Sequence, residues 1–397
     1  MEYSPVVLDA INHKTFPKVE LFVRLDGKFT LYKPAETKLT IHNIERLREG
    51  GVEFVYINSA DSEEVQGHIE ERLDDSQAAK TLSQYSRNLI SSQIINNCID
   101  DVFQHPHNAA AFKKCHSVLQ KISFEFADQH ELFQLFAKLE GNFEKYLITH
   151  STQTTILAMY LAGRLFNATG EYLLEIGLGS MLHDIGMLNV AGDITQKVDA
   201  LTESEYHRVK LHPKQGIGLL RDVGITNEVV RDIVLFHHER ANGTGYPKGL
   251  DGPNIPRHAM LVSLCDIYCA LTMTRPYKSA STPAEAFQTL KSEKRLFDPD
   301  ILAGFLSIMA EAVPPPVEEE KQQTREAGGK SVDMAAVREM KRHIRNAGSD
   351  RTKLVSLHSI LTDSIQNSYG EEKVALSDLR IELKNLLNSL FNDNRPA

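Results

Sequence analysis

The sequence His183-Asp184-Ile185-Gly186 decides how this chain is read, together with a second stretch that begins with His237-His238-Glu239 and ends with Gly245-Tyr246-Pro247. Adjacent His-Asp and His-His pairs are poor core material, because a buried carboxylate without a partner costs on the order of several kcal/mol. The same imidazoles and carboxylates are good ligands for metal ions. The two stretches therefore predict a metal centre.

Three more residues of the same kinds complete the candidate ligand set, namely His150, His212 and Asp266. Neighbouring side chains of a helix diverge by about 100°, so His183 can bind one ion while Asp184 bridges toward a second. We expect the first ion to be held by His150, His183, Asp184 and Asp266, and the second by Asp184, His212, His237 and His238. Nitrogen and carboxylate ligands without thiolates fit iron, manganese or zinc, and the set does not choose among them.

Other residues of these types carry no such prediction. A single histidine on a helix is more often a surface or core residue than a ligand, and most of the 16 histidines are read in that way. Cys265 and Cys269 flank Asp266, but the two further thiolates of a zinc site are absent, so both are read as core residues. Asn242-Gly243-Thr244-Gly245 lacks the preceding strand and the following lysine of a phosphate-binding P-loop, which favours a tight turn.

The composition indicates a globular protein of several domains. A length of 397 residues suggests two or three domains. The net charge of −9 argues against a general nucleic-acid binder, but it leaves room for a small phosphorylated ligand. No segment reaches the roughly 18 apolar residues that span a bilayer, and the N-terminus lacks the features of a signal peptide. Four cysteines without a C-x-x-C pair fit a reducing compartment, so we expect a soluble cytoplasmic protein.

The chain is predicted to be mainly α-helical. Residues 1–75 predict a small α+β module with a hairpin at 20–32, a helix at 40–49 and a strand at 52–57. Residues 76–142 predict scaffold helices, and residues 143–312 predict an all-helical domain with helices at 147–166, 172–182, 203–220 and 257–273. Pro314-Pro315-Pro316 lies in a predicted linker at 313–333, before a helical C-terminal extension at 334–397.

Together these motifs resemble the HD-GYP family, a branch of the HD phosphohydrolase superfamily. The resemblance covers residues 143–312 and runs in order through His150, His183-Asp184-Ile185-Gly186, Leu201-Thr202 to Glu205, His212-Pro213, His237-His238-Glu239, Gly243, Gly245-Tyr246-Pro247, Asp266, Ala270-Leu271-Thr272 and Arg275-Pro276-Tyr277-Lys278. It implies an all-helical catalytic domain with a two- or three-metal centre that hydrolyses cyclic di-GMP to linear pGpG or to GMP. The seven candidate ligands occupy the matching positions.

The resemblance also implies roles for single residues. Gly245, Tyr246 and Pro247 would shape the substrate pocket, and Arg275 and Lys278 would contact phosphates or guanine. Asp184 would bridge two divalent ions, and a hydroxide between those ions would be the nucleophile. Iron or manganese is the expected metal, with zinc or magnesium as alternatives. The proton donor is unassigned.

Two departures from the family pattern affect the expected chemistry. Met187 stands where lysine is usual, and methionine cannot protonate a leaving alkoxide, a step worth about 10²–10⁴-fold in rate. Turnover is therefore expected to be slow, with Lys197 as a hypothetical substitute donor. Tyr146 stands one helical turn before His150, where three-metal members carry glutamate, so we predict two metal ions.

These departures leave more than one function open. A metal-dependent cyclic di-GMP phosphodiesterase is the leading hypothesis. The alternative is a degenerate member that binds cyclic di-GMP, or a signalling protein such as a GGDEF-domain protein, without turnover. A third reading is hydrolysis of another cyclic dinucleotide or of another phosphoester. The helical flanks at 80–140 and 334–392 are compatible with a homodimer, and neither a membrane nor a nucleic-acid polymer is an expected partner.

Overall fold

A computed structural model describes residues 2–25, 27–74, 81–122, 129–143, 145–190, 201–274 and 280–310, together with the single residues 194, 197, 342, 344 and 383. Contacts divide the chain into two compact units, one that includes residues 1–72 and one that spans residues 73–317. The predicted linker at 313–333 lies outside the described residues, and so does all but three residues of the predicted extension at 334–397. The domain boundaries therefore stay predictions.

The first unit is built around a four-stranded antiparallel sheet. Its strand order is β1 (Tyr3–Val7), β4 (Phe54–Asn58), β2 (Leu21–Leu25) and β3 (Lys28–Lys33), and the sheet is accompanied by α1 (Ile41–Glu49) and α2 (Ser62–Asp74). The predicted hairpin at 20–32, the helix at 40–49 and the strand after it at 52–57 are confirmed as β2–β3, α1 and β4. Strand β1 was not predicted, because Pro5 interrupts the run; as an edge strand, β1 tolerates a residue that cannot donate a ladder hydrogen bond.

The second unit is helical, which confirms the mainly α fold class. Within the described residues its helices are α4 (Gln84–Gln104), α5 (Ala109–Lys121), α6 (Gln129–Asn142), α7 (Tyr146–Phe166), α8 (Gly170–Leu182), α10 (Glu203–Val209), α11 (His212–Asp222), α12 (Glu228–Phe236), α13 (Arg257–Thr272), α14 (Pro283–Ser292) and α15 (Pro299–Ala310). A 3₁₀ helix, η3 (Ile185–Asn189), follows α8.

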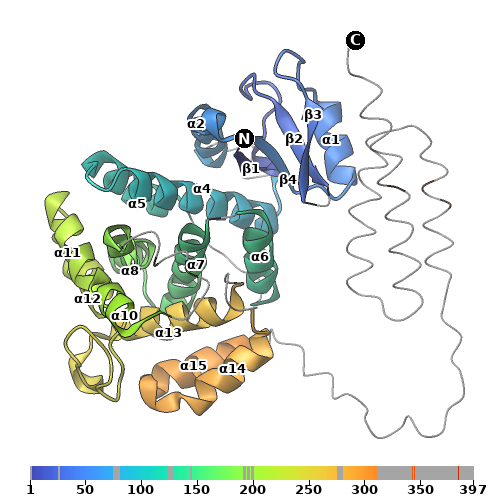
Figure 1. Ribbon diagram of the computed structural model, residues 1–397. Coiled ribbons are helices and arrows are strands. Elements are labelled where there is room, and N and C mark those ends of the chain that lie inside the picture. Colours follow the sequence, from blue (N-terminus) through green and yellow to red (C-terminus); the bar gives the residue numbers. More distant parts are fainter. Residues whose placement is uncertain are drawn as a thin grey trace, which may run out of the picture. The chain divides into compact units, whose positions relative to one another are not determined.

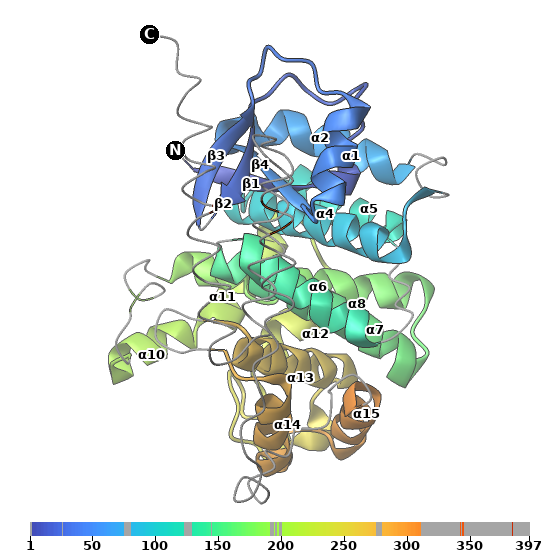
Figure 2. The ribbon, with the colours of Figure 1, turned by 90° about the vertical axis from the view of Figure 1, so that its right-hand side faces the viewer.

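Helix α7 lies at the centre of this unit (Figures 1 and 2). Its residues are buried without interruption from Ile148 to Ala162. Helices α4, α6, α8, α13 and α15 all contact it. A helix buried on all sides must be apolar or must satisfy its polar groups internally, and the Thr152 and Thr155 hydroxyls accordingly donate to carbonyls of α7 one turn earlier.

One predicted helix was wrong. The expected continuous helix at 203–220 is divided into α10 and α11, with a break at Lys210 and Leu211. Pro213 explains the break, because proline has no N–H with which to bond the carbonyl of Val209 four residues earlier. The Nδ1 of His212 occupies that free carbonyl instead, at 2.8 Å. The break therefore orients a candidate ligand.

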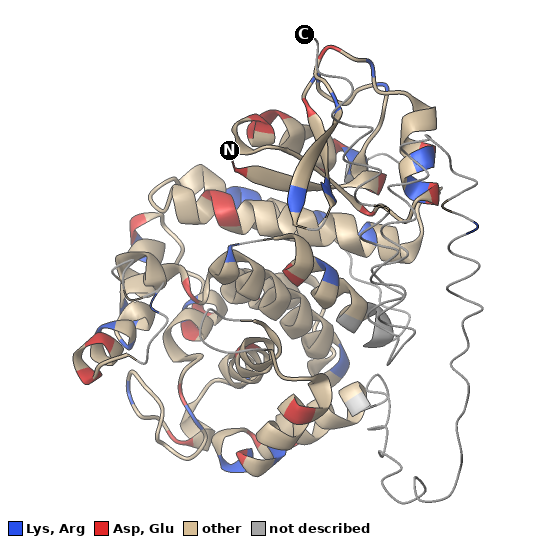
Figure 3. Ribbon diagram, turned by 45° about the vertical axis from the view of Figure 1, so that its right-hand side comes forward, with Lys and Arg blue, Asp and Glu red and all other residues tan. Residues whose placement is uncertain are grey.

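Charged residues are interspersed over the described chain rather than concentrated on one helix or strand (Figure 3). Among the helices that the structure describes, none is long and apolar enough to cross a membrane.

Candidate metal centre

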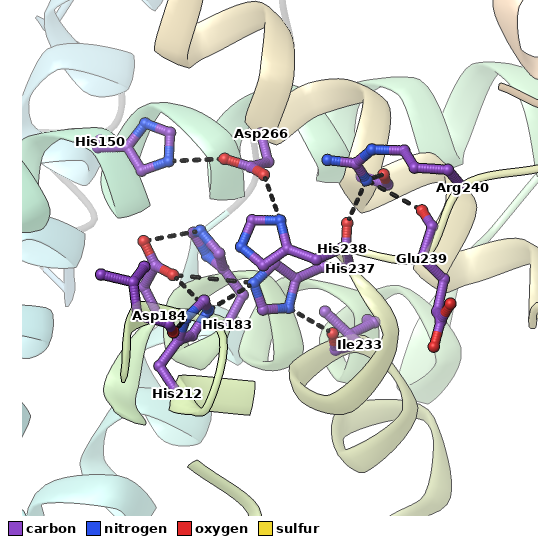
Figure 4. A network of polar contacts seen from close by, with 12 residues as sticks. His150, His183, Asp184, His212, Ile233, His237, His238, Glu239, Arg240 and Asp266 are labelled. Atoms are coloured by element: carbon purple, nitrogen blue, oxygen red, sulfur yellow. Dashed lines mark hydrogen bonds and ion pairs between the residues drawn. The ribbon is translucent and has the colours of Figure 1, made fainter. Parts of the chain in front are cut away.

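The candidate ligands lie at the ends of helices or on helices that meet near the middle of the second unit. His150 is on α7 and Asp266 is on α13, whereas His183 and Asp184 directly follow α8. His212 is the first residue of α11, and His237 and His238 directly follow α12. Figure 4 shows these side chains directed toward one another.

Two overlapping groups of potential ligands form, and Asp184 belongs to both. One ligand atom from each member lies within 4.8 Å of those of the others in the group Asp184, His212, His237 and His238, and likewise in the group His150, His183 and Asp184. Asp266 belongs to neither group. Its Oδ1 lies 3.0 Å from Nε2 of His150, and its Oδ2 lies 3.8 Å from Nδ1 of His238. The predicted ligand roles stay predictions, but the side chains are adjacent.

Three of the imidazoles are held in one orientation by the backbone of their own chain segment. Nδ1 of His183 donates to the carbonyl of Ser180 at 2.7 Å, and Nδ1 of His212 donates to that of Val209 at 2.8 Å. Nδ1 of His237 lies 3.0 Å from the carbonyl of Ile233. A carbonyl oxygen only accepts, so each Nδ1 carries the hydrogen and each neutral ring has its lone pair on Nε2.

These Nε2 lone pairs converge on the Asp184 carboxylate. Nε2 of His212 lies 3.2 Å from Asp184 Oδ1 and 3.1 Å from Nε2 of His237. Nε2 of His183 lies 3.5 Å from Asp184 Oδ2, and this buried nitrogen has no hydrogen-bond partner among the residues that the structure describes. The imidazole Nε2 atoms and the carboxylate oxygens are all hydrogen-bond acceptors, and buried acceptors that face one another repel unless a cation lies between them. The donor set therefore fits divalent metal ions.

The electrostatics of the site favour the ionisation states that bind metal. Burial lowers the pKa of His183 to about 4, and burial followed by the neighbouring His237 holds the pKa of His238 well below its usual range. Burial alone would raise the pKa of Asp184, but the imidazoles around it, His183 first, hold that pKa well below its usual range. Near neutral pH these two histidines are neutral and the carboxylate is charged, as ligands must be.

His212 is the exception within the cluster. Burial lowers its pKa, but the hydrogen bond to Asp184, the negative charge of that carboxylate, the Val209 carbonyl and Asp266 together outweigh burial, so the pKa of His212 is raised. A proton on this ring is one way to place positive charge between the acceptors, and a metal ion is the other. A metal ion bound at His212 would therefore compete with a proton for the ring.

Gly186 explains how the His-Asp pair reaches His212. A Cβ added at Gly186 would lie 1.9 Å from the carbonyl oxygen of His212 and 2.6 Å from the amide nitrogen of Gly216. The backbones of η3 and α11 therefore touch at this point, which only glycine permits. This contact brings Asp184, two residues before Gly186, beside the His212 ring.

The Gly245-Tyr246-Pro247 segment lies against the second His pair. The Tyr246 ring stacks on His238 with centroids 4.7 Å apart, and the Tyr246 amide donates to the carbonyl of His238. A Cβ at Gly245 would lie 2.4 Å from Glu239 Cα, so this glycine also permits a close backbone contact. Gly245 and Tyr246 thus lie beside the candidate ligand His238 and the residue after it, whereas Arg275 and Lys278 lie outside the described residues.

Two residues of this region were given no role from the sequence. The buried carboxylate of Glu239 accepts hydrogen bonds from the backbone of Lys248 and Leu250. Arg240 donates to the carbonyls of His237 and Glu239. In the sequence, two charged residues that directly follow two candidate ligands could have suggested a role for Glu239 and Arg240. Their partners are backbone atoms, however, and which backbone atoms lie nearby depends on how the chain folds.

The departures from the family pattern can also be placed. Met187 lies in η3, one residue after Gly186. Lys197, the hypothetical substitute donor, forms an ion pair with Glu205 at 2.7 Å. The Tyr146 ring stacks on the His150 ring with centroids 5.7 Å apart.

Comparison with known proteins agrees with this geometry. A family model described as an HD domain matches residues 142–301. The chain is 36% identical over 163 residues to a cyclic di-GMP phosphodiesterase of Pseudomonas aeruginosa, covering 41% of this chain and 39% of that protein. It is 31% identical over 228 residues to a cyclic di-GMP phosphodiesterase of Thermotoga maritima, covering 56% of this chain and 62% of that protein. The matches thus span less than two thirds of either relative.

A solved structure supports the same fold. Bd1817, described as an HDG"Y"P protein from Bdellovibrio bacteriovorus, superposes with a TM-score of 0.57 and 21% sequence identity, and the match covers 78% of this chain and all of that one. The family model, the relatives and the fold agree with the resemblance found in the sequence. Residues 142–301 of this chain therefore match the family model of an HD domain, in agreement with the resemblance to the HD-GYP family that the sequence indicates.

Proposed function

We propose that the HD domain is a metal-dependent phosphodiesterase that hydrolyses cyclic di-GMP to linear pGpG or to GMP. The observation that carries this proposal is the convergence of the Nε2 atoms of His183, His212 and His237 on the Asp184 carboxylate. The names of the relatives support the substrate, because two proteins similar to this domain are cyclic di-GMP phosphodiesterases.

Two ions are proposed, with Asp184 shared between them. His150, His183 and Asp266 would complete the first site, and His212, His237 and His238 would complete the second. Iron or manganese is the proposed metal, with zinc or magnesium as alternatives. Bound ions would neutralise the phosphodiester oxygens and lower the pKa of a water molecule. The protein contributes a largely buried site, in which such charges are screened less than in water.

Tyr246 is proposed to bind a phosphate oxygen. Burial, followed by the negative charge of Asp184, raises the pKa of the Tyr246 hydroxyl, so it stays protonated and can donate a hydrogen bond. Its ring lies on His238, one of the proposed ligands. Gly245 and Pro247 fix the backbone on either side of it. Arg275 and Lys278 remain proposed contacts for phosphate or guanine.

Exposed apolar side chains lie in sequence between two of the candidate ligands, which suits an organic ligand better than a bare phosphate. Seven large hydrophobic side chains are exposed among the described residues, and four of them, Leu188, Leu201, Tyr206 and Leu211, lie in sequence between Asp184 and His212. The Lys210 ammonium lies 4.8 Å from the centre of the Tyr206 ring. Aromatic rings and cations of this kind bind bases and phosphates.

The test is hydrolysis by the full chain, loaded with Mn²⁺ or Fe²⁺ under reducing conditions. Cyclic di-GMP and a mixed guanine–adenine cyclic dinucleotide are supplied separately, and products are separated by chromatography. Cleavage of cyclic di-GMP that is lost in His183→Ala and on chelation supports the proposal. Preference for the mixed dinucleotide would change the substrate, and no cleavage of either would refute the enzyme.

One observation favours a second function, namely binding without turnover. Met187 cannot supply a proton, and the Lys197 ammonium is already paired with Glu205. In that case cyclic di-GMP would bind, as measured by calorimetry, but would not be cleaved. Cleavage that appears only in Met187→Lys would support this receptor function. A protein partner, such as a GGDEF-domain protein, and a homodimer stay predictions.

A further inference from the structure

The buried carboxylate of Glu239 does not face the candidate metal ligands. Its Oε1 accepts the backbone N–H of Lys248 at 2.7 Å, and its Oε2 accepts the backbone N–H of Leu250 at 2.8 Å. Glu239 as a whole residue is 2% exposed, and it is absent from both groups of potential ligands. Both oxygens are therefore engaged by one loop rather than by the site.

The same loop is attached to the His237–Arg240 segment at two further points. The Tyr246 amide donates to the carbonyl of His238 at 3.2 Å. Gly245 lies so close to Glu239 that a Cβ would be 2.4 Å from Glu239 Cα and from the Arg240 amide nitrogen. Between these attachments the Tyr246 ring stacks on His238. Lys248 and Leu250 follow Tyr246 in the chain, so their bonds to Glu239 hold the loop on the C-terminal side of Tyr246. The other two attachments hold it at Gly245 and at Tyr246 itself.

We propose that Glu239 is a positioning residue, whose carboxylate fixes the loop of residues 245–250 so that Tyr246 lies over His238 and binds substrate with full affinity. A charged acceptor suits this task, because hydrogen bonds to a carboxylate are about twice as strong as those between neutral groups. The effect on substrate affinity rests on the proposed function, whereas the effect on the loop does not.

The informative variant is Glu239→Gln. Glutamine has the same size and one carbonyl oxygen, but its NH₂ group donates, so one of the two backbone amides would face a donor instead of an acceptor. Loss of a charge-assisted bond together with a donor–donor contact corresponds to a change of roughly tenfold or more. Asp251→Asn is the matched control, because it makes the same chemical change at an exposed residue directly after the loop, where the amide oxygen of asparagine can still accept the hydrogen bond from Asn254.

The first measurement is hydrogen–deuterium exchange of the metal-loaded full chain. In Glu239→Gln the amides of residues 245, 246 and 248–250 should exchange about tenfold faster or more than in the wild type, whereas those of α7 and α13 should not change. Asp251→Asn should exchange like the wild type over residues 245–250. Unchanged exchange in Glu239→Gln would overturn the positioning role, whatever the protein does to cyclic di-GMP.

The second measurement is catalysis with metal content determined alongside. Glu239→Gln should raise KM for cyclic di-GMP about tenfold or more, with a smaller change in kcat and the same metal content as the wild type. A faster-exchanging loop with unchanged KM would overturn the link to substrate. If the wild type neither binds nor cleaves cyclic di-GMP, the proposed function fails while the exchange result still decides the positioning role.

A second variant keeps the proposal testable if Glu239→Gln does not fold. Gly245→Ala leaves Glu239 intact and displaces the loop from the other side, because its Cβ would meet Glu239 Cα. It should show the same faster exchange and the same rise in KM. Wild-type values for both would contradict the proposal.

Discussion

The contact between η3 and α11 makes a strong prediction for Gly186→Ala. The added Cβ would lie 1.9 Å from the carbonyl oxygen of His212, whereas real Cβ contacts are essentially never shorter than 3.0 Å. The obstacle is backbone, and a second backbone atom, the nitrogen of Gly216, lies at 2.6 Å. Neither can rotate away as a side chain would, so η3 and α11 must separate by about 1 Å.

Overpacking of a buried site typically costs 1–3 kcal/mol, and two backbone obstacles place this substitution at the upper end, about 3 kcal/mol. The same separation moves Asp184 away from His212, so metal affinity should also fall about tenfold or more. Urea unfolding of the metal-free chain, followed by circular dichroism, measures the first effect. With a slope of about 3 kcal/mol/M, the midpoint should fall by roughly 1 M.

Gly218→Ala is the control for this prediction. Gly218 lies on α11, two residues after Gly216, and nothing lies within 4 Å of a Cβ built there. Alanine should stabilise that helix by up to about 1 kcal/mol, because glycine is a poor helix former. If Gly186→Ala unfolds at the wild-type midpoint and binds Mn²⁺ with wild-type affinity, the reasoning from the backbone contact is refuted.

Three further predictions follow from other contacts. Pro213→Ala restores an N–H that competes for the Val209 carbonyl now held by His212 Nδ1, so Mn²⁺ affinity in a chelator competition should fall about tenfold; wild-type affinity would show that this bond is unimportant. Asp184→Asn should lower bound metal, measured by elemental analysis, because Asp184 is the one residue shared by both ligand groups; full occupancy would exclude its bridging role. The third prediction concerns His68, whose Nε2 accepts a hydrogen bond from the Asn12 amide and whose pKa is lowered by burial. The unfolded chain therefore binds a proton at His68 more readily than the folded chain does. The first unit should accordingly lose stability as the pH falls below about 6.5. His68→Gln should reduce that pH dependence in urea unfolding, and an unchanged slope would contradict it.

Much of the fold and of the candidate site could be predicted from the sequence, because both depend on local patterns. Apolar residues at helical spacing indicated the helices around His150 and Asp266, and the rarity of adjacent His-Asp and His-His pairs identified the candidate ligands. The structure brings six of the seven into two groups that share Asp184. Asp266 contacts His150 and His238 but belongs to neither group.

The remaining features depend on contacts between distant segments. Pro213 signalled a helix start in principle, but an unbroken apolar pattern on both sides favoured one long helix. The role of Glu239 required knowing that Lys248 and Leu250 turn back toward it. Strand β1 exists because β4 offers it a partner fifty residues away, which no local pattern around Pro5 indicates.

The backbone carbonyls that hold His183, His212 and His237 each lie three or four residues earlier in the chain. The orientation of each imidazole ring is thus determined by a carbonyl within about one helical turn of the same chain segment. Assembly of the centre then requires only that these helix ends arrive at one place, and no ion is needed to turn the rings. If divalent ions bind here as proposed, their ligands are already oriented by their own chain segments, so binding would cost little side-chain entropy.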